Sequence, residues 1–400
     1  MKILHTSDWH IGKRLGNVYR LEEQRKVLDE ICAIAHKKSV DAVVVAGDVF
    51  DVYNPPVDAI ELVYSQLKKL SLNGKRPVVV IAGNHDSPDR IEAPNALARD
   101  NGIFLFGYPK SQYTSFTNDL LFTVSKTAPG FVEFTLASQE KLRVIVAPFA
   151  NEHRMKEAFI TDESKTLTDS LRLFWKQIAD TYCDNSGVNI CLGHHLILPK
   201  SQTEIEEPDN EKPIQAISEL LPPNVIPSQI QYVALGHLHS NRIVSHNPHI
   251  QYSGSICAYS FSEAHHKKHI TIVTCNSGEK AEIEKVELHT PRDLVRVSCS
   301  GIEEAREWLE NNQDCYVELT IHVDTYIRPV DIKSLHAIHD GIIYIIPLMP
   351  VQQTHESSSV AVSHNRSMQD LFAEYFESKN GVKPSKEICS IFNEIVSITE

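Results

Sequence analysis

The chain has 400 residues, of which 42% are hydrophobic, so we expect a main domain with a real core and one or two smaller domains. Its eight cysteines are scattered without a Cys-x-x-Cys pair, which excludes a disulfide framework and indicates a reduced, cytoplasmic protein. The net charge of −13 disfavours a nucleic-acid binder unless metal ions or a basic partner supply positive charge. No stretch has the apolar length of a signal peptide or of a membrane span, so we expect neither.

Up to about residue 265, short β-branched runs alternate with helix-like stretches. The expected elements are strand 2–8, helix 21–38, strand 41–48, helix 57–70 and strand 77–86. Extended runs between 103 and 149 then predict antiparallel strands, and a helix over 170–182 precedes the run VNICLGHH. This succession is typical of a layered α/β domain.

The pattern changes towards the C-terminus. An acidic, Pro-rich stretch over 203–214 predicts a solvated loop. Residues 285–350 predict a compact β-α-β-α-β unit, which we interpret as a second domain after a first domain over 1–284. Polar residues 351–366 predict a linker, and 367–400 predict two amphipathic helices broken at Asn380-Gly381. Two short helices bury little by themselves, so we expect them to dock on another surface.

Five of the strand-like runs end in polar groups. These groups are Asp8-Trp9-His10, Gly47-Asp48, Gly83-Asn84-His85-Asp86, Gly193-His194-His195 and Gly236-His237-Leu238-His239. Ligands of α/β sheets bind beyond the carboxyl ends of the strands, so the five groups could converge on one site. Carboxylates, imidazoles and an amide suit Mn, Fe or Zn. Each motif alone is more often a structural strand end, whereas the five together predict a site for two metal ions.

The side chains are also sufficient in number for two metal ions. Asp8, His10 and either His237 or His239 can hold one ion. Asn84, one of His194 and His195, and the remaining C-terminal histidine can hold the other, while Asp48 can bridge both. Two such ions can activate water against a phosphoryl group. His85, which follows Asn84 and points the other way, is then the candidate to protonate the leaving oxygen.

Only one of the adjacent histidines 194 and 195 can face the site, because neighbouring residues of a strand point to opposite faces. The parallel with Gly236-His237 favours the residue that follows the glycine, so His194 is the predicted ligand. His195 then faces away, with a structural hydrogen bond or support of a ligand as its expected role.

The motifs SDWH, GDVFD, GNHDS, GHH and GHLHS resemble those of the calcineurin-like metallophosphoesterases. More narrowly, MKILHTSDWHIGK, VVVIAGNHDSPDR and YSGSICAYSFSE resemble the bacterial nuclease subunits that work with the SMC-like ATPase SbcC. The resemblance implies an α/β sandwich of two mixed β-sheets flanked by helices, with a small α+β capping domain over 285–350. It also implies that the helical pair over 367–400 binds the ATPase.

The same resemblance implies a role for each site residue. Asp8, His10, Asp48 and His239 would hold one ion, and Asp48, Asn84, His194 and His237 the other, with His85 assisting the leaving group. The implied cofactor is two Mn²⁺ ions, with Mg²⁺, Fe or Zn as alternatives. The implied activity is exonuclease on double-stranded DNA ends and endonuclease on single strands and hairpins, in DNA repair, recombination and replication. The implied assembly is a homodimer within a heterotetramer with SbcC.

Basic residues near the motifs are candidates for contacts with DNA phosphates. Lys13, Arg14 and Arg20 follow the first motif, and HHKKH spans 265–269. Both groups could equally be solvated turns. Two other functions also stay open at this point, a metallophosphodiesterase of small nucleotides and a non-catalytic scaffold of the same fold.

Overall fold

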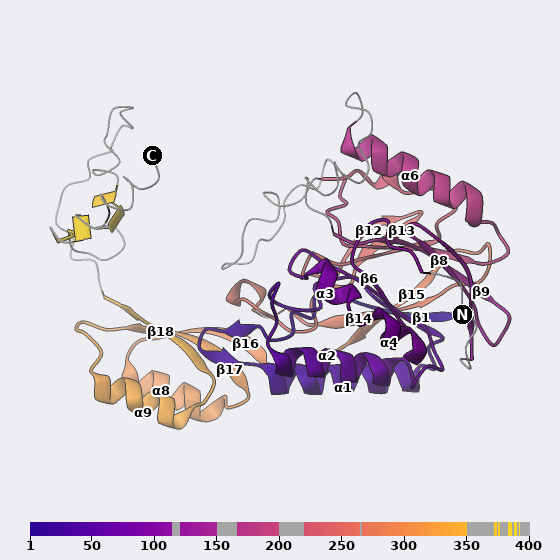
Figure 1. The fold of residues 1–400 in the computed structure, drawn as a ribbon. Coiled ribbons are helices and arrows are strands. Elements are labelled where there is room, and N and C mark those ends of the chain that lie inside the picture. Colours follow the sequence, from indigo (N-terminus) through magenta and orange to yellow (C-terminus); the bar gives the residue numbers. More distant parts are fainter. Residues whose placement is uncertain are drawn as a thin grey trace, which may run out of the picture. The chain divides into compact units, whose positions relative to one another are not determined.

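The computed structural model describes residues 1–113, 121–149, 166–199, 220–264 and 266–349, together with isolated positions near the C-terminus (Figure 1). The chain divides into two compact units, Met1–Met349 and Pro350–Glu400. The predicted loop 203–214 and linker 351–366 lie outside the described residues. No helix in the described ranges is long and apolar enough to cross a membrane.

The first sheet has six strands in the order β15-β14-β1-β4-β5-β6. Its strands are β1 (Lys2–Thr6), β4 (Ala42–Val45), β5 (Val78–Ile81), β6 (Ile103–Phe106), β14 (His269–Thr274) and β15 (Glu282–Glu287). The pairs β1–β4, β4–β5 and β5–β6 are parallel, whereas β14 runs antiparallel to both β1 and β15. β4, β5 and β6 are buried along their whole length, which explains why their sequences are continuous apolar runs.

The second sheet has seven strands in the order β12-β13-β11-β10-β9-β8-β7. These strands are β7 (Thr123–Ala128), β8 (Phe131–Thr135), β9 (Lys141–Ala147), β10 (Val188–Gly193), β11 (Tyr232–Leu235), β12 (Arg242–His246) and β13 (His249–Tyr252). The inner faces of the two sheets share one apolar core, which includes Val44, Ile81, Phe104, Val144, Ile190 and Leu192. The expected sandwich of two mixed sheets is therefore confirmed.

Helices cover the outer faces of both sheets (Figure 1). α1 (Leu21–Lys37) and α2 (Val57–Leu70) pack their apolar faces on the first sheet, and α6 (Leu167–Tyr182) packs on the second. α6 begins at Thr166, whose hydroxyl accepts a hydrogen bond from the Asp169 amide at 3.1 Å. The shorter elements are β2 (Arg14–Leu15), β3 (Val18–Tyr19), α3 (Pro88–Glu92), α4 (Asn95–Ala98), η1 (Arg99–Asn101), η2 (Pro223–Val225) and η3 (Phe261–Glu263).

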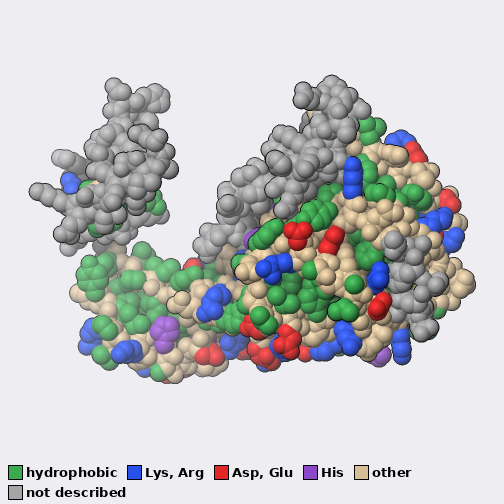
Figure 2. Space-filling model, viewed as in Figure 1, with side chains coloured by type: hydrophobic (Ala, Val, Ile, Leu, Met, Phe, Trp, Pro, Cys, Tyr) green, Lys and Arg blue, Asp and Glu red, His purple; other side chains and the backbone are tan. Residues whose placement is uncertain are grey.

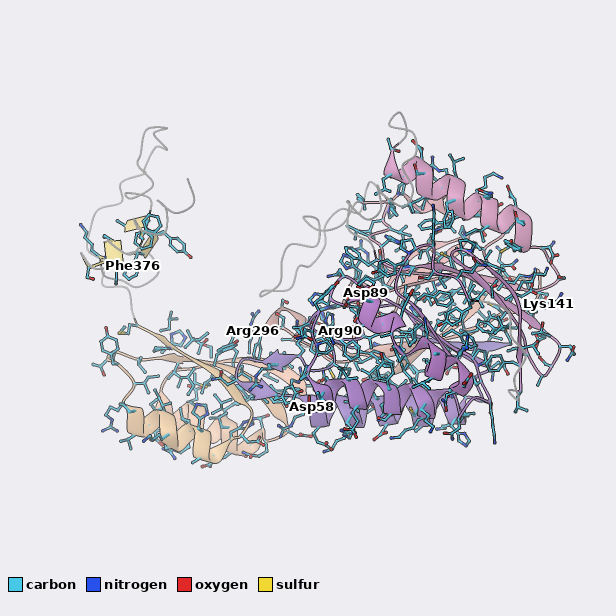
Figure 3. The ribbon with its side chains drawn as sticks, in the orientation of Figure 1. Asp58, Asp89, Arg90, Lys141, Arg296 and Phe376 are labelled. Carbon is cyan, nitrogen blue, oxygen red and sulfur yellow. The ribbon has the colours of Figure 1, made fainter. Side chains whose placement is uncertain are left out.

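Residues 293–348 form a smaller α/β part with its own core. Its elements are β16 (Asp293–Cys299), α8 (Ile302–Asn311), β17 (Cys315–His322), α9 (Pro329–Ile338) and β18 (Ile342–Leu348), and its three strands are parallel. Arg296 pairs with Glu318 at 2.7 Å on this sheet (Figure 3). Hydrophobic side chains gather on the surface of this part in Figure 2, and Ile346 and Leu348 of β18 are among the exposed ones. Its assignment as a capping domain stays a prediction.

The second unit is described only at isolated positions. There the Phe372 ring stacks on the Phe392 ring with centroids 3.9 Å apart, and the Phe376 ring lies 5.9 Å from that of Phe372 (Figure 3). Aromatic packing of this kind fits an apolar seam between the two predicted helices. The binding role of residues 367–400 stays a prediction.

A buried ion pair at the start of α1 contacts the smaller part. The Arg20 guanidinium donates to both carboxylate oxygens of Glu23 at 2.7 and 2.9 Å, and it lies 4.9 Å from the centre of the Tyr316 ring. Glu23 also accepts hydrogen bonds from the Arg292 amide at 2.9 Å and from the Tyr316 hydroxyl at 3.1 Å. Arg20 is only 1% exposed. The expected DNA contact does not fit Arg20, because its guanidinium is buried and already bonded.

We predict that Arg20→Ala destabilises the protein by about 3–5 kcal/mol, because Glu23 is left buried without its guanidinium partner. Arg25→Ala is the matched control on the same helix, since Arg25 is 42% exposed and 3.4 Å from Glu22. Its effect should stay within about 0.5 kcal/mol. Urea unfolding measures both values, and equal free energies of unfolding for the two variants would contradict this role of Arg20.

Candidate metal centre

The carboxyl ends of parallel strands from both sheets meet at one place, and all the predicted ligands lie there. Asp8 and His10 follow β1, Asp48 follows β4, Asn84 follows β5, His194 follows β10, and His237 and His239 follow β11. A hydrogen bond of 2.8 Å from the His237 amide to Asp8 Oδ1 joins the two sheets across the site. Three groups of described residues bring their ligand atoms within 4.8 Å of one another, namely Asp8–His10–His239, His10–Asp51–His85 and Asp48–His194–His237.

The first group forms around His10. Its Nε2 lies 3.1 Å from Nε2 of His239, so two imidazole nitrogens point at the same small volume. The same His10 nitrogen lies 3.6 Å from Asp48 Oδ2. Burial lowers the pKa of His10 to about 4, which leaves its ring neutral at pH 7. The neutral ring has a lone pair for a metal ion.

The second group forms around Asn84. Its side-chain oxygen lies 3.0 Å from His194 Nε2 and 2.8 Å from His237 Nδ1. His194 Nε2 is also 3.3 Å from Asp48 Oδ2, so the Asp48 carboxylate lies between both groups. Burial opposes protonation of His194, but the Asp48 and Asp8 carboxylates and the Ala46 carbonyl together outweigh burial and raise the pKa of His194 to about 9. The other His194 nitrogen, Nδ1, is 2.7 Å from the Ala46 carbonyl, which fixes the ring orientation.

His194 and His195 lie in different surroundings. The His194 ring contacts Asp48 and Asn84, whereas the centre of the His195 ring lies 5.9 Å from that of Trp175 on α6. Burial lowers the pKa of His195 to about 3. The backbone carbonyl of His195 accepts a hydrogen bond of 2.9 Å from the Tyr252 hydroxyl. His194 is therefore the histidine of the pair that can reach an ion beside Asp48.

The donor atoms fit divalent cations on their own chemistry. Asp8, His10, Asp48, His194 and His237 are all at most 4% exposed, and their carboxylate and imidazole ligand atoms gather in small groups. Burial raises the pKa of Asp8 to about 6, because its charge is costly away from water. Two cations would pair with the carboxylates and with the lone pair of the neutral His10 ring, and they would displace the proton from His194. The identity of the metal does not follow from these donors.

The backbone is strained at four of the predicted ligands. The φ angles are 50° at Asp8, 43° at His10, 49° at Asp48 and 97° at His237. Such values cost non-glycine residues about 1–3 kcal/mol each, so the surrounding structure must hold them. The Asp8 and His10 amides donate to Gly47 and Asp48 carbonyls at 3.0 and 2.9 Å, which provides part of that support.

Two glycines allow the loops to approach the ligands. A Cβ atom on Gly47, whose φ is +86°, would lie 2.3 Å from His194 Nδ1. A Cβ atom on Gly83 would lie 2.1 Å from Asp48 Oδ1 and 2.2 Å from the Asp48 amide nitrogen. These close contacts give a physical reason for glycine in the second and third motifs.

His85 lies at the edge of the centre. Its Nδ1 is 2.7 Å from the Asp51 carbonyl oxygen, which can only accept, so Nδ1 carries a proton. Its backbone amide donates to Asp48 Oδ1 at 2.8 Å, and its ring packs edge-on against that of His10 with centroids 4.7 Å apart. A ring nitrogen of His85 also lies within 4.8 Å of ligand atoms of His10 and Asp51.

Lys13, one of the other expected DNA contacts, lies beside this edge, and Arg14 follows it on β2. Lys13 Nζ donates to Asp51 Oδ1 at 3.0 Å, and the Arg14 guanidinium donates to the Asn17 carbonyl at 2.6 Å. The Lys13 side chain is 14% exposed, whereas Arg14 is exposed. Both residues therefore already have protein partners, and their contact with DNA stays a prediction.

Several buried polar side chains to which the sequence analysis assigned no role position the ligand loops. Asp86 accepts hydrogen bonds from the Gly83, Phe50 and Val49 amides at 2.8, 2.9 and 3.1 Å, which joins the second motif to the third. Gln24 on α1 donates to the His10 carbonyl at 2.8 Å and accepts from the Gly12 amide at 3.0 Å. The run GNHD pointed to Asp86. Gln24 could not be recognised from the sequence, because it is one of many polar residues in an amphipathic helix.

A second missed group lies behind His239. Glu263 Oε1 is 3.5 Å from His239 Nδ1 and accepts a hydrogen bond of 2.9 Å from the Tyr259 amide. Lys268 donates to Glu263, and it also donates to Ser255 Oγ at 2.9 Å. Lys268 belongs to the basic run at 265–269, but it is only 6% exposed. The structure therefore places Lys268 among the supports of His239 and away from solvent.

Comparisons with known proteins agree with the sequence motifs. Residues 1–241 match the sequence model of the calcineurin-like phosphoesterase family. The chain is 35% identical over 410 residues to the D component of the nuclease SbcCD of Bacillus subtilis, covering all of this chain and 99% of that protein. A dimetal phosphatase structure from Danio rerio covers 72% of the chain and 96% of its own at 11% identity, with a TM-score of 0.41. A Thermus thermophilus structure covers 71% and 98% at 12% identity, with a TM-score of 0.33.

We predict that Gly83→Ala lowers metal affinity about 10- to 100-fold, because the added Cβ displaces Asp48. Gly301→Ala is the control, since no atom lies within 4 Å of its added Cβ. Metal bound per chain after dialysis measures the effect, and far-UV circular dichroism verifies the fold. Asp48→Asn, which keeps the side-chain volume, should also lose metal if Gly83→Ala does not fold. Wild-type metal content in Asp48→Asn, or in folded Gly83→Ala, would contradict this arrangement.

Proposed function

This chain belongs to the calcineurin-like phosphoesterase family, and from that premise we propose that it is a metal-dependent DNA nuclease subunit that hydrolyses phosphodiester bonds. The observation that carries the proposal is the position of Asp48, whose Oδ2 lies 3.6 Å from His10 Nε2 and 3.3 Å from His194 Nε2. One carboxylate between two groups of nitrogen and oxygen donors is the arrangement that two bridged cations require. The name of the Bacillus subtilis relative supports DNA as the substrate.

The two ions share Asp48 in this proposal, and their other side chains differ. Asp8, His10, Asp48 and His239 would hold one ion, and Asp48, Asn84, His194 and His237 the other. When bound, two divalent cations offset the charge of the phosphoryl oxygens and make a water molecule more acidic. We assign Mn²⁺ to both positions, with Mg²⁺, Fe or Zn as alternatives. The cations would also supply positive charge that a chain of net charge −13 lacks.

His85 would act on the leaving oxygen. Its Nδ1 donates to the Asp51 carbonyl at 2.7 Å, which holds the ring in one orientation. A proton on Nε2 can then pass to the oxygen of the departing strand as the P–O bond breaks. The His85 ring lies beside that of His10, so this proton donor is adjacent to the proposed metal positions.

We assign the rest of the chain to substrate and partner binding. Residues 1–284 would form the nuclease domain, 285–350 a capping domain that positions DNA, and 367–400 the segment that binds SbcC. The proposed activities are exonuclease on double-stranded ends and endonuclease on single strands and hairpins. The protein would act as a homodimer within a heterotetramer, in cytoplasmic DNA repair, recombination and replication. The name of the relative, which is one component of the nuclease SbcCD, supports a partner protein.

A cleavage assay with the purified full chain tests the proposed function. With Mn²⁺ it should cut single-stranded or hairpin DNA, and addition of SbcC and ATP should extend cleavage to duplex ends. Cleavage of bis-p-nitrophenyl phosphate or cyclic nucleotides without any cleavage of DNA, even with SbcC present, would instead favour a small-nucleotide phosphodiesterase. If the metal-loaded protein hydrolyses none of these substrates, the result would favour a non-catalytic scaffold of the same fold.

We predict that His85→Gln lowers DNA cleavage about 10²- to 10⁴-fold, because the proton donor is lost. Its metal content should stay close to that of the wild type, because the ligand side chains are intact. His289→Gln is the control, since His289 is a surface histidine with a 78% exposed side chain. Equal losses of metal and of cleavage in His85→Gln would show that His85 is itself a ligand.

Deletion of residues 367–400 should abolish co-purification with SbcC and leave the metal content unchanged, because every proposed ligand precedes the deleted segment. Pull-down of tagged SbcC measures the first effect and metal analysis the second. Undiminished co-purification of the truncated chain would refute the assignment of the tail.

A further inference from the structure

A groove of about 350 Å³ adjoins the metal centre at His239. We call it the lysine groove, and its lining residues are His239, Ser240, Asn241, Ser253, Gly254, Ser255, His266, Lys267, Lys268, His269 and Lys285. They come from the loop after β11, the segment after β13, the segment just before β14, and the strands β14 and β15. The groove therefore connects a predicted metal ligand with the edge of the first sheet.

The lining of the lysine groove is basic although the chain is acidic. Three lysines and three histidines line it, and none of its described lining residues is Asp or Glu, whereas the net charge of the whole chain is −13. Two carboxylates beside the lining lysines are already engaged by them, Glu263 by Lys268 and Glu287 by Lys267 at 3.9 Å. A hollow with this lining attracts anions.

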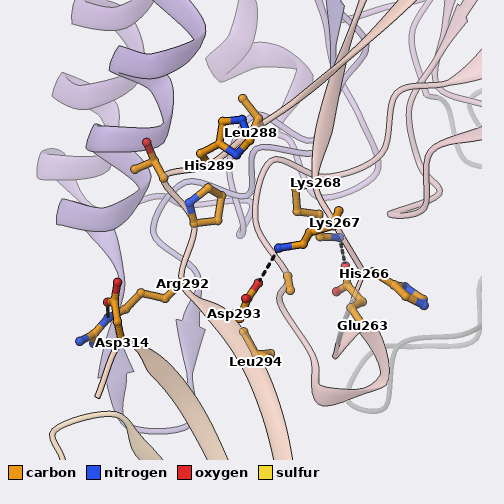
Figure 4. A pocket seen from close by; sticks show the side chains of 13 residues that line it. Glu263, His266, Lys267, Lys268, Leu288, His289, Arg292, Asp293, Leu294 and Asp314 are labelled. Atoms are coloured by element: carbon orange, nitrogen blue, oxygen red, sulfur yellow. Dashed lines mark hydrogen bonds and ion pairs between the residues drawn. The ribbon is translucent and has the colours of Figure 1, made fainter. Parts of the chain in front are cut away.

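The floor of the groove is held by a buried lysine. Lys268 is 6% exposed and donates to Glu263, to Ser255 Oγ at 2.9 Å and to the His239 carbonyl at 3.3 Å. These bonds fix the segment before β14 against the loop that carries His239. Figure 4 shows Lys268 directed at Glu263, and Lys267 directed at Asp293 across a neighbouring hollow. The lysine groove is thus a preformed feature of the fold.

Lys285 is the basic side chain most available to a ligand. It is exposed on β15, opposite Thr271 of β14, and it forms no ion pair with the described residues. The Lys267 side chain is 58% exposed, and its ion pairs with Glu287 and Asp293 are long, at 3.9 and 3.7 Å. Exposed pairs of this kind are weak, so an incoming anion can compete for Lys267.

We propose that the lysine groove is an anion subsite that binds an internal phosphate of the DNA strand whose neighbouring phosphate lies at the metal centre. This inference rests on the proposed function, because it takes a nucleic acid as the substrate. Ammonium groups and the exposed Ser240 hydroxyl are typical donors to phosphate oxygens. The subsite would fix the strand relative to the metal centre without reading its sequence.

Binding of a short fluorescent single-stranded oligonucleotide tests the proposal, measured with Mn²⁺ on the full chain carrying His85→Gln, which is expected to keep its metal and to cleave slowly. Lys285→Gln should weaken binding about three- to tenfold and reduce the slope of log K against log salt by about 0.7. Lys267→Gln/Lys285→Gln should reduce the slope by about 1.4. Lys280→Gln, in the turn between β14 and β15 and outside the groove lining, is the matched control and should leave both values unchanged.

The outcomes separate the subsite from the proposed function. If both groove variants keep the affinity and the salt slope of the unsubstituted groove, the subsite is overturned. The proposed function would stand in that case, because the chain still binds and cuts DNA. An affinity loss confined to oligonucleotides with a terminal phosphate would overturn the assignment of an internal phosphate. If the wild type neither binds nor cuts DNA, the proposed function and the subsite fail together.

Discussion

The buried carboxylate of Asp48 is the constraint on which the rest of the centre depends. A charge that is 2% exposed costs several kcal/mol unless positive or hydrogen-bonding partners surround it. The protein provides His194 at 3.3 Å, the His85 amide at 2.8 Å and His10 at 3.6 Å, each from a different loop. Two cations beside Asp48 would give these loops a common partner, which explains why strands from both sheets end at the same place.

The fold holds this arrangement at a cost in backbone strain. Four predicted ligands adopt positive φ angles, and the loops pass so closely that Gly47 and Gly83 have no room for a Cβ atom. Buried polar side chains provide the support. Asp86 ties two loops together through three amides, and Gln24 reaches His10 from α1. The centre is therefore supported from helix α1 as well as from the sheets, which makes its geometry a property of the whole sandwich.

Much of the fold follows from the sequence because its signals are local. Apolar β-branched runs predict the strands of the sandwich, and the polar groups that end them predict where the ligands gather. Alternation along a strand lets only one of His194 and His195 face the site, and the parallel with Gly236-His237 favours His194. The two rings do lie in different surroundings. The pairing of the strands into six- and seven-stranded sheets is not local, and no motif specifies it.

The residues that sequence reasoning misplaced are charged side chains whose partners lie far away in the chain. Arg20 follows the first motif as an exposed phosphate contact would, but Tyr316 and the Ala258 carbonyl bury it. Lys268 belongs to a basic run, yet it bonds to Glu263 inside the protein, while Lys267 beside it is exposed. Composition cannot separate a buried lysine from a solvated one, because the difference arises from tertiary contacts.

The most direct test of the metal centre is anomalous diffraction from crystals grown with Mn²⁺, with data collected at the manganese absorption edge. We predict two anomalous peaks on either side of Asp48, one near His10 and His239 and the other near Asn84, His194 and His237. A single peak, or a peak bound by His195 instead of His194, would contradict the two-ion assignment or the ligand set on which it rests.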